Sequence, residues 1–200
     1  MTKETAQKLQ EAKRAALNEP HMELLTAFVQ QIRQERPPEE YIPDFDPDDG
    51  AMKAEVLFVL EAPGPQAKAT GFVSRDNPDQ TASNLKAYLQ EAGISRKQSL
   101  VWNIVPWYLG TGKTIQAAAS ADIQAGSVYL ERLLALLPHL KAVVLVGRKA
   151  QSAFQKGGLT TELPLHLAYH PSPVFVHLHP DNKKKIVEEF RKVAVELNRK

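Results

Sequence analysis

Short apolar runs alternate with amphipathic stretches along most of the chain. Four runs have the length and composition of buried strands, and they cover residues 55–60, 100–105, 141–146 and 165–169. Around them, apolar residues recur at helical spacing, which predicts helices over 81–92, 122–137, 149–155 and 181–197. Strands that alternate with helices of this length favour right-handed crossovers. We therefore expect an α/β fold, a three-layer α/β/α sandwich with a central four-stranded parallel sheet.

The first 50 residues have a different pattern from the rest. Two helical stretches come first, and a Pro- and Asp-rich segment, 36–50, follows them without any pattern of regular structure. We expect residues 1–50 to form N-terminal helices and an acidic linker, packed on a core domain of residues 51–200. At the predicted helix starts, Asp122 and Asp181 are expected as N-caps.

The composition narrows the class of protein. The chain has 200 residues, of which 43% are hydrophobic and 24% charged, and this is ordinary for one globular domain. It contains no cysteine, which excludes disulfides, thiol nucleophiles and cysteine-bound zinc or iron–sulfur clusters. No apolar stretch approaches the ~20 residues of a membrane helix, and the charged N-terminus lacks the apolar region of a signal peptide. These features predict a soluble, cytoplasmic protein without a membrane partner.

The charge is unevenly distributed. The formal net charge is +2, yet residues 35–50 hold seven acids and one arginine, so the remainder of the chain is more basic. A basic body permits a polyanionic partner such as nucleic acid without requiring one. The simpler interpretation is a solvated acidic linker and ordinary surface lysines.

Polar side chains mark the ends of three of the four predicted strands. Glu61 comes directly after the first strand, Asn103 lies near the end of the second, and His170 follows the fourth. Open parallel sheets bind ligands beyond the carboxyl ends of their strands, where these residues are expected to meet. Singly, each has a structural alternative, because a glutamate can solvate a turn and an amide or imidazole can bond a loop. Jointly, they indicate a functional site.

The sequence around these residues resembles the uracil-DNA glycosylase superfamily. Residues 60–64 (LEAPG) and 170–173 (HPSP), with Asn103 between them, are similar to its motifs in order and spacing. The first motif and the HPS motif are closest to the thermophile-type iron–sulfur branch, and the HPSP form is also similar to the single-strand-selective branch. Segment 71–79 occupies the place of the family's base-stacking aromatic. The resemblance covers residues 53–195.

The resemblance implies a mechanism in which a base is flipped out of the DNA stack into a pocket. Phe72 would be the surface on which the base stacks, and Ala62 would belong to the same base-binding set. The Asn103 amide, with one acceptor and two donors, would pair with the O4/N3–H edge of uracil. His170 would stabilise the charge that develops on O2, and Glu61 would orient or deprotonate the attacking water.

The same resemblance implies which residues hold the DNA strand. The two proline-containing motifs would contact phosphates, and residues 173–175 would fill the gap left by the flipped nucleotide. The implied set for the backbone and the wedge is Pro63, Gly64, Pro171, Ser172 and Pro173. Residues 110–114 (GTGKT) resemble only the tail of a phosphate-binding P-loop motif, so we interpret them as a flexible loop and add Lys113 as a candidate contact to DNA phosphate.

The sequence departs from the family at two points. The iron–sulfur branch binds its cluster through four cysteines, and this chain has none, so we expect no metal cluster and no cofactor. The best-known uracil enzymes have an aspartate at the position of Ala62 and a bulky tyrosine at that of Gly64. The first difference leaves catalysis to Glu61 and His170. The second leaves 5-substituted pyrimidines without the steric barrier that the tyrosine provides.

Two further patterns are set aside as metal sites. Four acidic residues have the spacing of a calcium loop, namely Asp44, Asp46, Asp48 and Glu55. However, Asp49 stands where such a loop needs glycine. The four histidines between residues 166 and 179 lack both cysteine partners and the helical HExxH spacing of a zinc site.

The sequence therefore predicts a monofunctional, cluster-free DNA glycosylase that hydrolyses the N-glycosidic bond of uracil in DNA during base excision repair. Its partner would be DNA that contains a damaged base, held by salt-sensitive phosphate contacts, and the protein is expected to be a monomer. Three alternatives stay open: a glycosylase for another base such as hypoxanthine, a non-catalytic module that binds DNA damage, and a hydrolase of free nucleotides or nucleosides.

Overall fold

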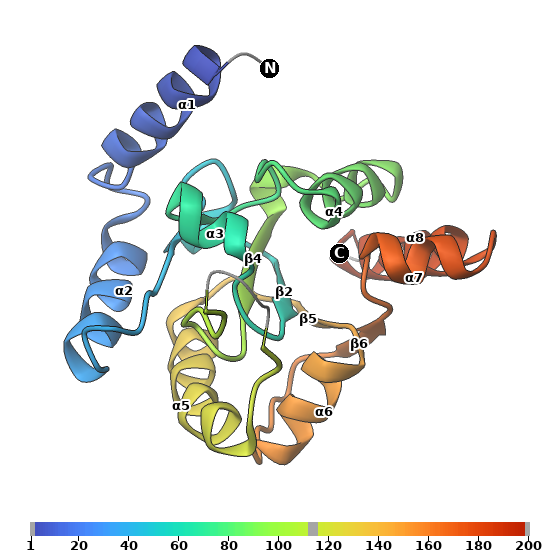
Figure 1. The fold of residues 1–200 in the computed structure, drawn as a ribbon. Coiled ribbons are helices and arrows are strands. Elements are labelled where there is room, and N and C mark those ends of the chain that lie inside the picture. Colours follow the sequence, from blue (N-terminus) through green and yellow to red (C-terminus); the bar gives the residue numbers. More distant parts are fainter. Residues whose placement is uncertain (1–2, 112–115, 199–200) are drawn as a thin grey trace.

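A computed structural model describes residues 3–111 and 116–198, with a four-stranded parallel sheet at its centre (Figure 1). The strands are β2 (Val56–Leu60), β4 (Ser99–Asn103), β5 (Ala142–Val146) and β6 (Leu165–Ala168). They lie in the order β4-β2-β5-β6, and every neighbouring pair is parallel, as the sequence predicts. The strand that follows β2 in the chain, β4, lies on one side of β2, and the next strand, β5, lies on its other side, so the strand order reverses at β2. Ligands of such sheets bind beyond the carboxyl ends at this reversal.

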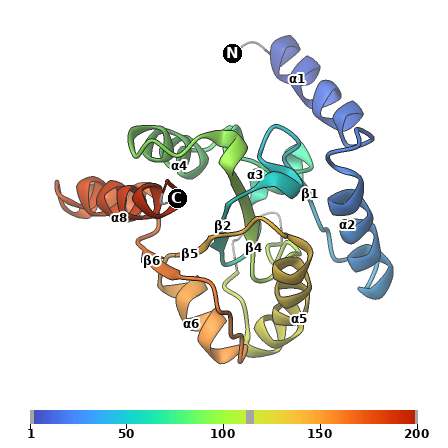
Figure 2. The ribbon, with the colours of Figure 1, turned by 180° about the vertical axis from the view of Figure 1, so that it is seen from behind.

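Helices cover both faces of the sheet and make the three layers. On one face α4 (Gln80–Glu91) packs against α8 (Asn182–Leu197), and on the other α5 (Ser120–Leu136) packs against α6 (Arg148–Lys156) (Figure 1, Figure 2). The predicted α/β/α sandwich is therefore confirmed. Among the helices in the described part of the chain, none combines the length and the apolar character needed to cross a membrane.

The core forms where apolar stripes of the helices meet the strands. Covered on both faces, the strands of a parallel sheet are apolar throughout, which explains their uninterrupted runs in the sequence. The buried stripe of α8 consists of Ile186, Val187, Phe190, Val193 and Leu197. Phe190 meets Phe58 of β2 edge to face, with the ring centroids 5.2 Å apart. On the opposite face Gly126 brings α5 close to the sheet, since a Cβ there would lie 2.4 Å from the Ile104 carbonyl oxygen.

The N-terminal helices reach the same core through α2 (Glu23–Glu35), while α1 (Lys3–Ala16) projects from the body (Figure 1). Next comes β1 (Asp44–Phe45), which pairs in parallel with β3 (Phe72–Val73). The expectation that residues 36–50 hold no regular structure is therefore wrong at this point. The Asp44 N–H donates to the Gly71 carbonyl at 2.8 Å, and Phe45 stacks on Trp102 with the ring centroids 3.8 Å apart.

The acidic segment is not simply a solvated linker, because two of its aspartates are buried. Asp46 and Asp49 have less than 2% of their surface exposed. The Asp49 carboxylate pairs with Arg96 at 3.0 Å and with Arg75 at 3.3 Å. Burial raises the pKa of Asp49 to about 6, although Arg75 acts to lower it. Cations from distant parts of the chain therefore hold this segment inside the protein.

Several short elements begin where the sequence indicates loops. α3 (Pro65–Thr70) and α7 (Pro173–Leu178) each start with proline, which suits the first helical turn because its missing N–H is not needed there. Two 3-10 turns, η1 (Ala51–Lys53) and η2 (Arg96–Gln98), precede β2 and β4. Asp122 is not the N-cap of α5 but lies in its first turn, where its carboxylate accepts from the Ala119 N–H at 2.9 Å. Asp181 is the N-cap of α8 as predicted, but among the described residues its side chain makes no capping hydrogen bond to the first turn of that helix.

Candidate active site

A cavity of about 1070 Å³ opens beyond the carboxyl ends of the strands, where the strand order reverses. Its wall includes the turn after β2, segment 73–79, the first turns of α4 and the end of β4 with residues 108–110 beyond it. The turn after β5 and residues from segment 169–178 complete the part of the wall that carries the motifs. These are strand-end loops on a rigid sheet, which is the usual position of binding residues in open α/β folds.

Asn103 ends β4 and lines this cavity. Its side chain is 3% exposed, and its Oδ1 has no hydrogen-bond partner among the described residues. An unpaired buried acceptor costs roughly 1–3 kcal/mol, so native proteins keep few of them. Oδ1 is therefore available to a donor on a ligand that enters the cavity.

Glu61 follows β2, and neighbouring segments fix both its backbone and its side chain. Its Oε1 accepts a hydrogen bond from the Ala118 N–H at 2.8 Å. Its carbonyl accepts from the Val105 N–H at 2.9 Å, which extends the pairing of β2 with β4 beyond the strands. The carboxylate of Glu61 thus has a defined direction at the wall of the cavity.

His170 packs on Gly147, the first residue after β5. A Cβ built on Gly147 would lie 3.0 Å from the Cβ and 3.2 Å from the Cδ2 of His170, and the φ of Gly147 is +88°. Only glycine accepts both this backbone conformation and this close approach. Burial lowers the pKa of His170 below 6.5, against the opposing effect of the Glu61 and Asp79 carboxylates. The imidazole is therefore mainly neutral at pH 7, with one N–H to donate.

The HPSP segment is fixed from two sides. From α4, the Asn84 Nδ2 donates to the Pro171 carbonyl at 2.9 Å. The Ser172 hydroxyl caps α7 by accepting from the Phe175 N–H at 3.4 Å. The Tyr169 ring stacks on that of Phe175, with the centroids 4.8 Å apart. The loop that carries His170 is therefore held by packing and hydrogen bonds before any ligand binds.

One side of α7 is apolar and faces solvent. Val174 and Leu178, one helical turn apart, are 76% and 73% exposed. Leu178 also lines the cavity. Exposed apolar side chains grouped beside a cavity are typical of a contact surface for a ligand or partner.

A comparison with protein families agrees with this geometry. The model of the uracil DNA glycosylase superfamily matches residues 47–191, which is more than half of the chain. The chain belongs to the uracil-DNA glycosylase superfamily. Membership supports a DNA glycosylase-like function, in which a hydrolase acts on the glycosidic bond of a DNA substrate. No curated protein matches the chain in a sequence comparison.

The structure brings many of the residues that resemble superfamily motifs into one cavity. The predicted residues in its wall are Glu61, Ala62, Pro63, Gly64, Asn103, His170 and Ser172. Phe72 is buried in β3 outside this lining, and its neighbour Val73 lines the cavity instead, because successive strand residues point to opposite sides. Pro171 and Pro173 also lie outside the lining, and Lys113 lies outside the described residues. The catalytic and binding roles of these residues stay predictions.

Further polar residues, outside the predicted set of site residues, also line the cavity. They include Ser74, Asn77, Asp79, Gln116, Arg148 and Lys149. Arg148 and Lys149 follow β5 as closely as Glu61 follows β2, so their position after a strand could have identified them. The family resemblance already places segment 71–79 at the site, but it does not indicate which side chains of the segment face the cavity, because the path of the segment depends on the pairing of β3 with β1.

One group of carboxylates in the described residues has the spacing of metal ligands. Oxygens of Asp46, Asp48 and Asp76 lie within 4.8 Å of one another, but none of the three residues lines the cavity. The Lys13 ammonium lies within 3.3 Å of an oxygen of each of them. A cation of the protein itself thus neutralises the group, and we assign no metal site there.

Proposed function

We propose that the protein is a monofunctional DNA glycosylase that removes uracil from DNA in base excision repair, acting as a cytoplasmic monomer. The observation that carries the proposal is Asn103 Oδ1, which has no partner among the described residues and is buried in the same cavity as Glu61 and His170. A base flipped out of DNA is read by its Watson–Crick edge inside an enclosed pocket. An orphaned amide acceptor at the end of a strand suits such an edge.

The base would be recognised through the donor and acceptor pattern of that edge. Uracil presents N3–H as a donor beside O4 as an acceptor. The Oδ1 of Asn103 accepts the N3–H, and the amide nitrogen donates to O4. With the amide in this orientation, cytosine, which has a lone pair at N3, leaves Oδ1 unpaired in a buried position, at a cost of roughly 1–3 kcal/mol.

Glycosidic cleavage places charge where Glu61 and His170 act. The C1′–N1 bond breaks with its electron pair moving to the base, so negative charge gathers on O2 and the sugar becomes cationic. The neutral His170 donates its N–H to O2, and loss of one such donor slows a reaction by about 10²–10³-fold. Glu61 stabilises the sugar cation and accepts a proton from the attacking water, whose oxygen forms the new bond to C1′. The base leaves as its anion and takes a proton from solvent, and Glu61 returns its proton to solvent, so the products are the free base and an abasic site.

The DNA strand would be held around the mouth of the cavity. Pro63, Gly64 and Ser172 line it and are assigned contacts to phosphates, together with Lys113. The wedge assigned to residues 173–175 is supported by the exposure of Val174, an apolar side chain that can occupy the space left by the flipped nucleotide.

A second candidate is a glycosylase for a base larger than uracil, and the space at Gly64 favours it. A Cβ built on Gly64 meets no atom within 4 Å, and the cavity volume of about 1070 Å³ exceeds that of a pyrimidine. Hypoxanthine presents N1–H beside O6, the same donor–acceptor order that Asn103 reads in uracil. Discrimination between the two bases then depends on their size, and the open space at Gly64 hardly limits the size of the base.

The test is release of a base from short single- and double-stranded oligonucleotides that carry one uracil, hypoxanthine or xanthine. Strand scission after alkali treatment measures the abasic product. Asn103→Ala, Glu61→Ala and His170→Ala are each compared with the same change at an exposed position outside the cavity, namely Asn198→Ala, Glu131→Ala and His139→Ala.

We expect scission at uracil, reduced by at least ~100-fold in the three cavity variants and unchanged in the three controls. Scission only at another base would refute the uracil assignment and retain the glycosylase. No scission at any base, with salt-sensitive DNA binding retained, would refute the enzyme and favour a module that recognises DNA damage.

A further inference from the structure

Helix α1 is anchored to the rest of the protein through one buried charge. Most of its described side chains are exposed, and Lys13 is the buried exception at 5% exposure. The helix itself projects from the body (Figure 1, Figure 2). A lysine is almost never buried unless it is paired, so the groups around Lys13 decide what α1 contributes.

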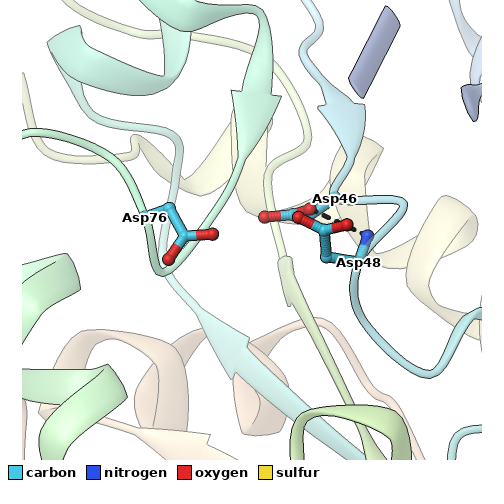
Figure 3. A group of neighbouring side chains, drawn as sticks. All are labelled: Asp46, Asp48 and Asp76. Carbon is cyan, nitrogen blue, oxygen red and sulfur yellow. Dashed lines mark hydrogen bonds between the residues drawn. The ribbon is translucent and has the colours of Figure 1, made fainter. Parts of the chain in front are cut away.

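The Lys13 ammonium joins two segments that are far apart in the sequence. It lies 2.5 Å from Asp46 Oδ2 and 3.3 Å from Asp48 Oδ2, both in the acidic segment after β1. It also donates to Asp76 Oδ2 at 3.0 Å and to Ser74 Oγ at 3.3 Å. Figure 3 shows the carboxylates of Asp46 and Asp48 on one segment and that of Asp76 on the other. Without a cation between them, these carboxylates would repel one another.

Other cations contribute to the same cluster, but none replaces Lys13. Arg96 contacts Asp46 at 2.5 Å and Asp76 at 2.6 Å, and Lys86 contacts Asp76 at 2.7 Å. Burial acts to lower the pKa of Lys13, yet Asp46 and Asp76 raise it above 10.5, so the ammonium stays charged. Asp48 is bound to Lys13 alone among the cations of the described residues.

The segment held by this cluster is also a wall of the cavity. Ser74 donates to Asp46 and accepts from the Asp76 N–H at 2.9 Å, so the cluster fixes the turn 74–76. Asn77 continues that turn and lines the cavity with Ser74. The Asn77 Nδ2 donates to the Phe72 carbonyl at 3.0 Å. One side of the segment thus faces the ion cluster and the other faces the space proposed for the base.

We propose that Lys13 is a positioning residue for the base-binding cavity, and that α1 acts on the site by fixing segment 73–79 through the cluster of Asp46, Asp48 and Asp76. The effect on a base rests on the proposed glycosylase function, whereas the effect on the segment does not. Asn103, Glu61 and His170 stand on other segments, so loss of the contact changes base binding more than the bond-breaking step.

The test compares Lys13→Met with Lys8→Met, a matched change on the same helix where the lysine is exposed and pairs with Glu4 at 2.7 Å. Hydrogen exchange of the 73–79 amides reports the conformation of the segment, and steady-state uracil release reports KM and kcat. Lys13→Met is expected to raise both the exchange rate and KM by about ten-fold, with kcat changed less than three-fold, as for a coupling of moderate size. Lys13→Arg, which restores the charge, is expected to recover part of both effects.

Removing only the cation leaves excess negative charge in a buried cluster, so Lys13→Met can unfold the protein. The double variant Lys13→Met/Asp48→Asn keeps the net charge of the cluster and is expected to fold with the same defects in exchange and KM. Folded variants with the exchange and KM of the wild type would overturn the proposal, as would a fall in stability without either change. If the wild type releases no base, the proposed function fails, and the exchange of segment 73–79 still decides the positioning role.

Discussion

Replacing Gly147 by alanine tests whether the close packing of His170 on the turn after β5 sets its position. The added Cβ would lie 3.0 Å from the Cβ of His170 and 3.2 Å from its Cδ2, both closer than ordinary contacts. The backbone at Gly147 has φ +88° and ψ 152°, a region that is nearly restricted to glycine. Alanine therefore strains the turn and displaces the imidazole.

The expected size of the effect has two parts. The backbone strain costs about 1–3 kcal/mol of unfolding free energy. For a protein of this length, each kcal/mol lowers Tm by roughly 2–4 °C. Displacing the only N–H of the neutral imidazole from the base O2 adds a kinetic loss of about 10²-fold, close to that of deleting the donor.

The assay combines thermal unfolding with single-turnover base release from a uracil-containing duplex. Gly158→Ala is the matched control, because Gly158 also has positive φ, +68°, but a Cβ there meets no atom within 4 Å and the residue does not line the cavity. The control is expected to lose stability and keep its rate. Wild-type turnover in a folded Gly147→Ala would refute the reasoning about His170.

Three further predictions follow from individual contacts. Asn84→Ala removes the bond to the Pro171 carbonyl, so base release is expected to fall about ten-fold, with a stability loss of about 1 kcal/mol. Asp79→Asn removes a carboxylate that opposes the lowering of the His170 pKa, so this pKa, followed by NMR titration, is expected to fall further. Gly126→Ala forces a Cβ against the β4 exit, so urea unfolding is expected to show a loss of about 1–3 kcal/mol.

Two of these predictions have a control variant, and the prediction for His170 fixes the direction in which stability changes with pH. Gln80→Ala removes only the exposed hydrogen bond between Gln80 and Asn84. If it slowed base release as much as Asn84→Ala does, the role of the bond from Asn84 to the Pro171 carbonyl would be contradicted. Since the folded pKa of His170 lies below 6.5, the unfolded chain binds the proton more readily, and this contribution to stability is lost as pH falls below 6.5. Gly64→Ala, with no atom within 4 Å of its Cβ, is expected to leave urea unfolding unchanged.

The sequence predicts the central sheet because buried parallel strands are apolar along their whole length. The runs that became β2 and β5 are bounded by polar or turn residues, which makes their ends visible. The same reasoning locates Glu61, Asn103 and His170, since each stands at the end of a strand and parallel strands bring their carboxyl ends to one edge of the sheet.

Other features depend on contacts that no local pattern contains. The pairing of β1 with β3 involves two residues on each side, too few for a periodic signal. The burial of Asp46 depends on Lys13 and Arg96, which are 33 and 50 residues away from it in the chain. The acidic segment therefore has the composition of a solvated linker and the structure of a buried ion cluster.

The placement of Phe72 depends on the same unpredicted pairing. The family resemblance assigns its ring to the cavity, whereas the structure buries it in β3 and exposes Val73 to the cavity. A shift of one residue along a strand moves a side chain to the opposite face, so the motif alone does not determine which of the two faces the base.

The most direct test of the account is to incubate the wild-type protein with a duplex that contains one uracil and to identify the released base by mass spectrometry. The account predicts free uracil and an intact strand with one abasic site, with release weakened by rising salt because phosphate contacts hold the DNA. Binding of the duplex without release of uracil or any other base would contradict it.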